Sequence, residues 1–113
     1  MSMKSARTPE RTSKMATPVC KLWMNRPREA FYQLSEEQLR THQAKVEEAM
    51  EKVGAKTLVL LNTAWSVEQW AWCGVTEFPD IGAVQKYVGL LQELGHYRYI
   101  EALTILGTKT EVS

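Results

Sequence analysis

A histidine set in an apolar helix pattern and a pair of alternating tyrosines are the side chains best suited to proton transfer. His42 interrupts a series of apolar residues three and four positions apart, which turns it toward the protein interior. Tyr97 and Tyr99 alternate with His96 and Arg98 in the stretch GHYRYIE, so the two tyrosines share one face of a strand. A histidine exchanges protons near neutral pH, and phenolic hydroxyls can orient a phenol or an enol. We therefore expect His42 to act as acid or base and Tyr97 and Tyr99 to assist it; the alternative is a partly buried His42 held by a backbone carbonyl or water.

Three tryptophans fall within eight positions of the stretch TAWSVEQWAWCGV. A two-residue turn between two strands would place Trp65 opposite Trp70 and Thr63 opposite Trp72. The alternation of side chains then puts all three indoles and Gly74 on one face of the hairpin. Two compatible interpretations remain open: the rings form the wall of a ligand pocket, or they pack against helices or a second subunit.

Other polar and aromatic residues are predicted to reach the same pocket. Trp23 on the first strand and Tyr32 before the first helix are expected to close it. Asn62 could hydrogen-bond a ligand carbonyl, with a role at the strand end as the alternative. Burial of the Glu101 carboxylate is costly unless the carboxylate is paired. If Glu101 points inward, we therefore expect it to bind ligand. An outward salt bridge to a basic residue is the alternative for Glu101.

The motifs indicate neither a metal nor a cofactor. Val46 stands four positions after His42, so this helix offers no second ligand at metal-binding spacing. His96 directly follows the helix terminator Gly95 and is expected near the surface. Phosphate-binding loops, nucleophile elbows, dinucleotide-binding fingerprints and CxxC pairs are all missing from the sequence.

The elements that must position these residues are four strands and two helices. Ser35 and Gln38 predict a capping box at the first helix and Gly54 its end, while Asp80 and Gly95 bound the second helix. Apolar and alternating runs predict the strands. The expected strands are 19–25, 56–65, 69–78 and 96–107, and the expected helices are 36–53 and 81–94.

This β-α-β-β-α-β order is the ferredoxin-like arrangement, an α+β fold with a four-stranded antiparallel sheet. Right-handed crossovers place both helices on one face of the sheet. The strand residues of the other face are too apolar to stay exposed, so we expect a homodimer formed sheet against sheet.

Length and charge indicate one domain at residues 18–109, with a short C-terminal tail at 110–113. Residues 1–17 carry four basic residues against one acidic residue, lack large aliphatic or aromatic side chains other than methionine, and are predicted to be a disordered basic tail. The remaining residues hold ten basic and twelve acidic side chains, so the domain offers no basic face for nucleic acid.

The cellular location is predicted from two kinds of segment that are not evident in the sequence. Apolar runs long enough to cross a membrane do not occur, and no secretory segment is evident. Cys20 and Cys73 are therefore expected as free thiols in a cytoplasmic protein, on strands that neighbour each other.

The stretches LSEEQL, EFPDIGAV and HYRYIEALTILG resemble those of a dimeric α+β barrel protein, most similar to a small bacterial-type family of unknown function. The likeness spans residues 19–109 and is most specific at the FPD of 78–80 and the tyrosine pair. This superfamily includes antibiotic-biosynthesis-type monooxygenases and muconolactone-isomerase-like proteins. The resemblance implies a small molecule held between helices and sheet; it leaves open a haem held by His42 or His96.

Together these features predict a homodimer that binds a compact aromatic or polyketide-like molecule, with a cofactor-free monooxygenase, isomerase or cyclase as the possible enzyme. The predicted ligand-binding residues are Trp23, Asn62, Trp65, Trp70, Trp72 and Glu101. The alternative is a non-catalytic ligand-binding or dimerisation module whose aromatic residues serve packing alone. An open cavity of roughly 300 Å³ or more between helices and sheet favours the enzyme.

Overall fold

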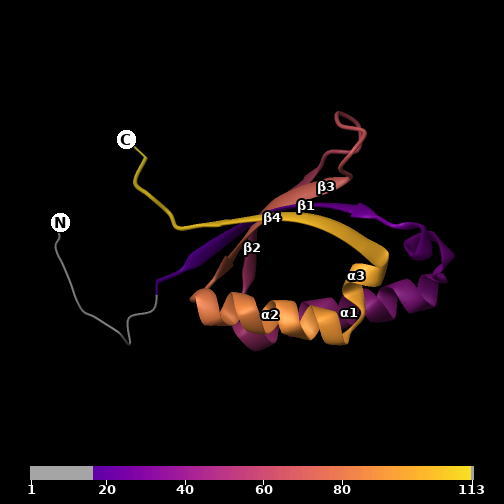
Figure 1. Cartoon of the computed structure of the whole chain (residues 1–113), viewed down its shortest axis with the longest axis horizontal. Helices are drawn as coiled ribbons and strands as arrows, with labels where there is room; N and C mark the ends of the chain where they lie inside the picture. The colour runs from indigo at the N-terminus through magenta and orange to yellow at the C-terminus, as the bar shows by residue number, and fades with distance from the viewer. Residues whose placement is uncertain (1–16, 113) are drawn as a thin grey trace.

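The computed structural model describes residues 17–112, which form a four-stranded antiparallel sheet with two long helices along one face (Figure 1). The strands lie in the order β2-β3-β1-β4, which confirms the predicted ferredoxin-like α+β fold. The elements are β1 (Val19–Pro27), η1 (Glu29–Gln33), α1 (Glu36–Val53), β2 (Lys56–Asn62), β3 (Trp72–Phe78), α2 (Ile81–Glu93), α3 (His96–Tyr99) and β4 (Ile100–Gly107). The tail predicted for residues 1–17 lies outside the described residues, except for Thr17.

Both long helices begin and end where the local sequence predicts. The Ser35 side chain accepts a hydrogen bond from the Gln38 backbone, and the Gln38 side chain bonds back to Ser35, so the capping box of α1 is complete. Gly54 ends α1 with φ at 74°. Asp80 caps α2 by accepting from the Ala83 backbone N–H, 2.7 Å away. Local hydrogen bonds thus fix the helix ends that position the site.

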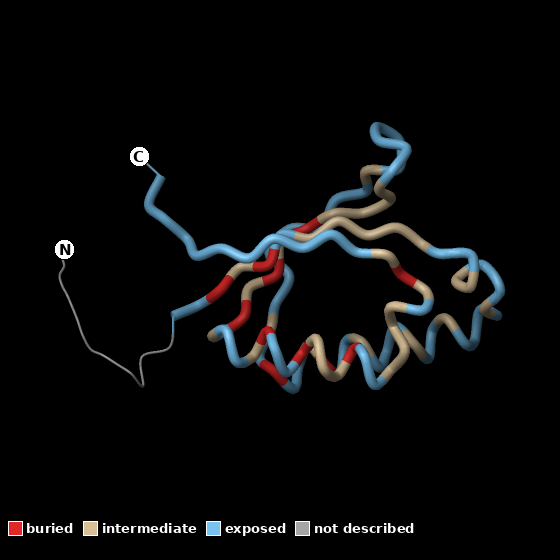
Figure 2. The backbone as a smooth tube through the Cα atoms, viewed as in Figure 1, coloured by how far each residue is buried: buried red, intermediate tan, exposed pale blue. Residues whose placement is uncertain are grey.

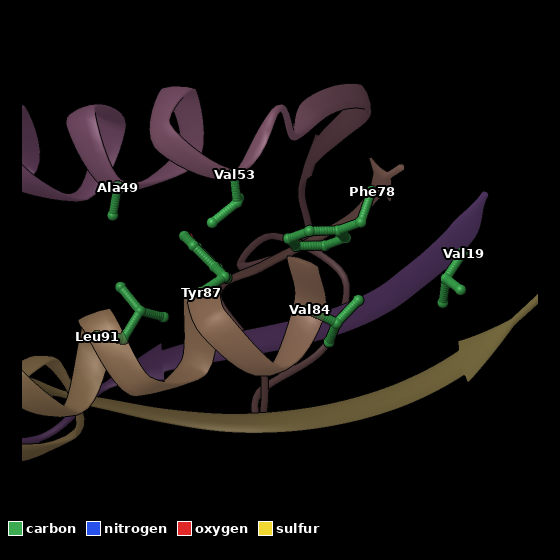
Figure 3. Packing of buried hydrophobic residues seen from close by; sticks show 7 residues of the cluster. All are labelled: Val19, Ala49, Val53, Phe78, Val84, Tyr87 and Leu91. Carbon is green, nitrogen blue, oxygen red and sulfur yellow. The ribbon is translucent and has the colours of Figure 1, made fainter. Parts of the chain in front are cut away.

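The hydrophobic core lies where one end of the sheet meets the two helices (Figure 3). Phe78 at the end of β3 is fully buried and packs against the ring of Tyr87 on α2. The other members of this cluster are Val19, Ala49, Val53, Val84 and Leu91. Figure 2 shows buried segments gathered at this end, whereas most of β4 is exposed. The helices are therefore anchored at one end of the sheet, away from α3.

Strand pairing sorts the sheet residues into a helix-facing inner face and an outer face. Val19 packs in the core and pairs with Phe78, so both are inner. Alternation then makes every second residue of β1, β3 and β4 inner, and a register shift between Thr57 and Val59 makes both Thr57 and Leu60 inner in β2. The inner set continues as Lys21, Trp23 and Asn25 in β1, Leu60 in β2, Trp72, Gly74 and Thr76 in β3, and Ile100, Ala102 and Thr104 in β4.

The outer face is apolar and open in the single chain. Leu22, Val59, Leu61, Leu103 and Ile105 alternate with the inner residues and are each more than 40% exposed. Cys20 and Cys73 also lie on this face as free thiols, with Cys73 opposite Met24 rather than opposite Cys20. The two cysteines thus lie on neighbouring strands, as the sequence predicts.

Three predicted strand boundaries are wrong, two in the hairpin and one at the start of the last strand. The hairpin has no two-residue turn, because β2 ends at Asn62 and β3 begins at Trp72, and residues 63–71 form a loop. Asn62 therefore pairs with Trp72, one residue out of the predicted register. The last strand begins at Ile100, because residues 96–99 form the short helix α3.

Among residues 17–112, no helix is long and apolar enough to cross a membrane.

Candidate functional site

A cavity of about 540 Å³ lies between the inner face of the sheet and the helices. It exceeds the volume at which an open helix–sheet interface favours ligand binding over packing. All four strands, both long helices, η1 and α3 contribute to its wall. Its aromatic and titratable lining residues are Lys21, Trp23, Phe31, His42, Glu47, Trp72, Tyr87, His96 and Tyr97.

The Trp23 ring packs directly against Gly74, its partner on the neighbouring strand β3. A Cβ on Gly74 would lie 2.7 Å from Cζ2 of the Trp23 ring and 2.5 Å from the backbone oxygen of Val59. Only glycine therefore leaves room for the indole at this point. The Trp23 indole N–H donates to Oγ1 of Thr76 at 3.0 Å. The ring is thus fixed in place with its polar atom satisfied, as a flat wall of the cavity.

The structure brings together the two histidines of the sequence, 54 residues apart. Nε2 of His42 on α1 lies 3.0 Å from Nδ1 of His96 on α3. The rings are parallel within 6°, and their centres, 5.2 Å apart, are farther from each other than these nitrogens. The two imidazoles therefore meet by their nitrogen-bearing edges, with one nitrogen donating and the other accepting according to the tautomers.

Burial keeps this histidine pair neutral. It lowers the pKa of His96 to about 4, with the charges of His42 and Lys21 adding to the effect. Burial also lowers the pKa of His42, and Lys45 acts in the same direction. Both side chains are therefore proton acceptors at neutral pH, each with one N–H and one lone pair. The prediction that His96 lies near the surface is wrong, because α3 turns it inward.

His42 faces two hollows. Besides the inner cavity, it lines a second hollow of about 440 Å³ together with Glu37, Lys45, Glu93 and Tyr99. This second hollow lies between α1, the end of α2 and α3. His42 is thus placed between the inner cavity and a polar opening on the outside of the helices.

Lys21 is a site residue that was not predicted from the sequence. Its side chain is on the inner face and only 8% exposed, and burial lowers its pKa. The ammonium lies 5.2 Å from the centre of the Tyr87 ring. Burial also raises the pKa of Tyr87, to about 12, with Tyr97 contributing. The inward position of Lys21 was predictable, because strand alternation in the VCKLW stretch places Lys21 on the same face as Val19 and Trp23.

The two tyrosines of the predicted pair do not share a strand face. Both belong to α3, so they point in different directions. Tyr97 lines the inner cavity, and burial raises its pKa. Tyr99 lines the second hollow instead and meets the His42 ring edge-on, with ring centres 5.3 Å apart. Tyr97 can contact a ligand in the cavity, whereas Tyr99 contacts His42.

Of the tryptophans in the hairpin, one reaches the cavity. Trp72 is on the inner face and packs near Phe31 of η1, with ring centres 6.5 Å apart. Trp70 lies beside Arg26, whose guanidinium carbon is 5.5 Å from the ring centre, and so belongs to the outer side. Trp65 is 84% exposed in the loop. The prediction of a shared face fails because the loop separates these residues from the strand.

Three further residues expected at the cavity lie elsewhere. Asn62 is exposed and accepts a hydrogen bond from the backbone N–H of Ala64, which is its alternative role at the strand end. Glu101 is on the outer face in a 2.8 Å ion pair with Arg26. Tyr32 is 70% exposed, while its neighbour Phe31 closes the cavity.

Within the described part of the chain, no group of three or more His, Cys, Asp or Glu residues is arranged to hold a metal ion. The histidine pair supplies two nitrogens, but they face each other across a hydrogen bond.

Comparisons with known proteins find a similar fold but indicate no activity. No family model matches the sequence, and no curated protein matches it. The structure is similar to that of the methylated RPA0582 protein, with a TM-score of 0.63 and 15% identity over 85% of this chain and 83% of that one. It is equally similar to RPA0582, a protein of unknown function from Rhodopseudomonas palustris, with a TM-score of 0.63 and 14% identity over 85% of both chains. At such low identity the likeness shows a shared α+β fold alone.

Proposed function

We propose that this protein is a homodimeric α+β barrel that binds a compact aromatic or enolisable molecule in the inner cavity and moves a proton on it. The observation that carries the proposal is the hydrogen-bonded pair of neutral histidines on the wall of a 540 Å³ aromatic cavity. Enolisation is the step common to isomerases, cyclases and cofactor-free monooxygenases of such substrates, and it needs a base rather than a cofactor.

The pair supports a relay rather than a single base. When His96 accepts a proton from the ligand at its second nitrogen, the proton shared with His42 can move toward His42. His42 can then release a proton into the second hollow, where Lys45, Glu37 and Glu93 meet solvent. Each imidazole exchanges one proton for another and stays neutral, so the negative charge created by the proton transfer is carried by the enolate in the cavity.

The apolar outer face supports the homodimer. Leu22, Leu103 and Ile105 belong to an exposed patch that spans the sheet, on the face opposite the helices. A second copy of the chain presents the same surface, so a two-fold axis would bury both patches at once. The cavity lies on the helix side and stays accessible in such a dimer.

Exchange of carbon-bound hydrogen tests the proton transfer. The protein is incubated with 2-tetralone in deuterated buffer, and loss of the α-proton signal is followed by NMR. We expect exchange faster than in buffer alone, reduced about 100-fold or more by His42→Ala or His96→Ala. Arg40→Ala, on the exposed side of α1 and outside both hollows, is the matched control and keeps the full rate.

Wild-type exchange no faster than buffer, or equal rates in the histidine variants, would refute the relay. Binding of the ketone, measured by calorimetry on the same samples, separates loss of chemistry from loss of the cavity.

The alternative function is a non-catalytic ligand-binding module. What favours it is that the two histidines satisfy each other and the Trp23 N–H is bonded to Thr76, so these three polar groups of the pocket have partners without a substrate. Ketone binding without exchange is the result expected of this alternative.

A further inference from the structure

Lys21 is a buried cation that the histidine relay does not use. Its place between Val19 and Trp23 in β1 sends the side chain to the inner face, where it lines the cavity with 8% of its surface exposed. Transfer of an ammonium group out of water costs several kcal/mol unless an opposite charge or a set of hydrogen bonds replaces the water, so most buried lysines are paired.

No carboxylate of residues 17–112 forms an ion pair with Lys21. The ion pairs of this region join Arg26 to Glu101 and Lys109 to Glu77, both on the outer face. Glu47 lines the cavity from α1 but is exposed and lies outside ion-pair distance of Lys21. The π face of Tyr87, 5.2 Å from the ammonium, is a weak substitute for a negative charge.

The space in front of Lys21 is shaped for a flat molecule. The rings of Trp23, Trp72 and Phe31 form the cavity wall, and Trp23 is locked by Gly74 and Thr76. His96 also lines this cavity, close enough to Lys21 for the ammonium charge to lower the pKa of His96. An acidic group on a planar ligand would therefore meet the ammonium and the histidine pair together.

We propose that the cavity takes a planar aromatic anion, a carboxylate, phenolate or enolate, whose negatively charged oxygen pairs with Nζ of Lys21. This inference rests on the proposed function, because it names the ligand class of the same cavity. For an enolisable ligand, Lys21 stabilises the enolate oxygen while the proton leaves through His96. The anion supplies the counter-charge that residues 17–112 do not provide.

A pair of probes that differ in charge alone tests the proposal. Binding of 2-naphthoate and of its neutral analogue 2-naphthamide is measured by calorimetry on the full chain. We expect wild-type protein to prefer the carboxylate by about tenfold or more, which is the size of one charge-assisted bond. Lys21→Met, which replaces the ammonium with an apolar group of similar length, abolishes this preference while the amide still binds. Lys21→Arg retains it, and Lys86→Met on the exposed side of α2 is the matched control.

A third probe distinguishes the sources of the oxyanion. 4-Nitrophenol turns yellow as its phenolate, so a yellow bound form below its solution pKa supports the phenolate or enolate class. Tight binding of 2-naphthoate without this colour supports the carboxylate class.

Equal affinity of wild-type protein for both naphthalene probes, or a carboxylate preference that survives Lys21→Met, would overturn the inference. Binding of the amide alone overturns it as well, yet leaves the proposed function standing. If neither probe binds, the inference fails together with the cavity as a ligand site.

Discussion

The buried histidine pair makes a definite prediction about how stability depends on pH. His96 has a pKa of about 4 in the folded protein and the ordinary 6.5 in the unfolded chain, so the unfolded chain binds more protons between these values. This contribution to stability is therefore complete above pH 6.5 and is lost as the pH falls toward 4. The glutamine variant His96→Gln can still hydrogen-bond His42 but does not titrate.

The magnitude follows from the two pKa values. At about pH 5 their difference corresponds to about 2 kcal/mol, because each tenfold ratio of protonation is worth about 1.4 kcal/mol. His96 is half-buried and solvent screens part of this penalty, so about 1 kcal/mol remains. The loss of unfolding free energy between about pH 7.5 and pH 5 is therefore expected to be about 1 kcal/mol smaller in His96→Gln than in the wild type.

Urea unfolding at both pH values, at one protein concentration, measures this double difference. Carboxylates elsewhere titrate in both proteins and cancel. Arg98→Gln, on the exposed side of the same short helix, controls for the loss of a neighbouring group and should keep the wild-type pH dependence. Identical pH dependence in wild type and His96→Gln would refute the burial argument and with it the neutral histidine pair.

Two further predictions concern the sheet. Gly74→Ala places a Cβ 2.5 Å from the Val59 oxygen and should lower the free energy of unfolding in urea by about 2 kcal/mol. Gly89→Ala in α2 meets open space and should be neutral or stabilising. Equal effects of the two variants would contradict the close packing at Gly74. Leu22→Glu on the outer face should convert the proposed dimer to a monomer in light scattering. Ile81→Glu, also exposed but at the start of α2, should leave that dimer intact. A wild-type monomer would contradict the sheet-to-sheet proposal.

Features set by near neighbours in the chain were predictable from the sequence. Ser35 and Gln38 complete their capping box within one helical turn, and Gly54 ends the helix in a left-handed conformation that glycine adopts without strain. The strand order then followed from the order of elements and the handedness of their connections.

The site was harder to predict because it depends on register and on contacts between distant residues. The predicted two-residue turn placed Trp65 and Trp70 on the inner wall, but residues 63–71 form a loop that carries them away from it. At Gly95 the second helix ends but a new helical turn begins, so His96 faces α1 instead of solvent. Neither the loop conformation nor a contact across 54 residues is encoded in local propensity.

The position of β1 in the middle of the sheet has a consequence for how the chain is made. Cys20 near its start pairs with Glu77 on one side and with Gly107 on the other, so the first of these four strands to be made is the last to gain both neighbours. The nascent chain can form α1, the β2–β3 hairpin and α2 before β1 has gained β4 as its second neighbour. Because Lys21 and Trp23 belong to β1 and His96 directly precedes β4, the cavity wall is complete only after β4 has been made.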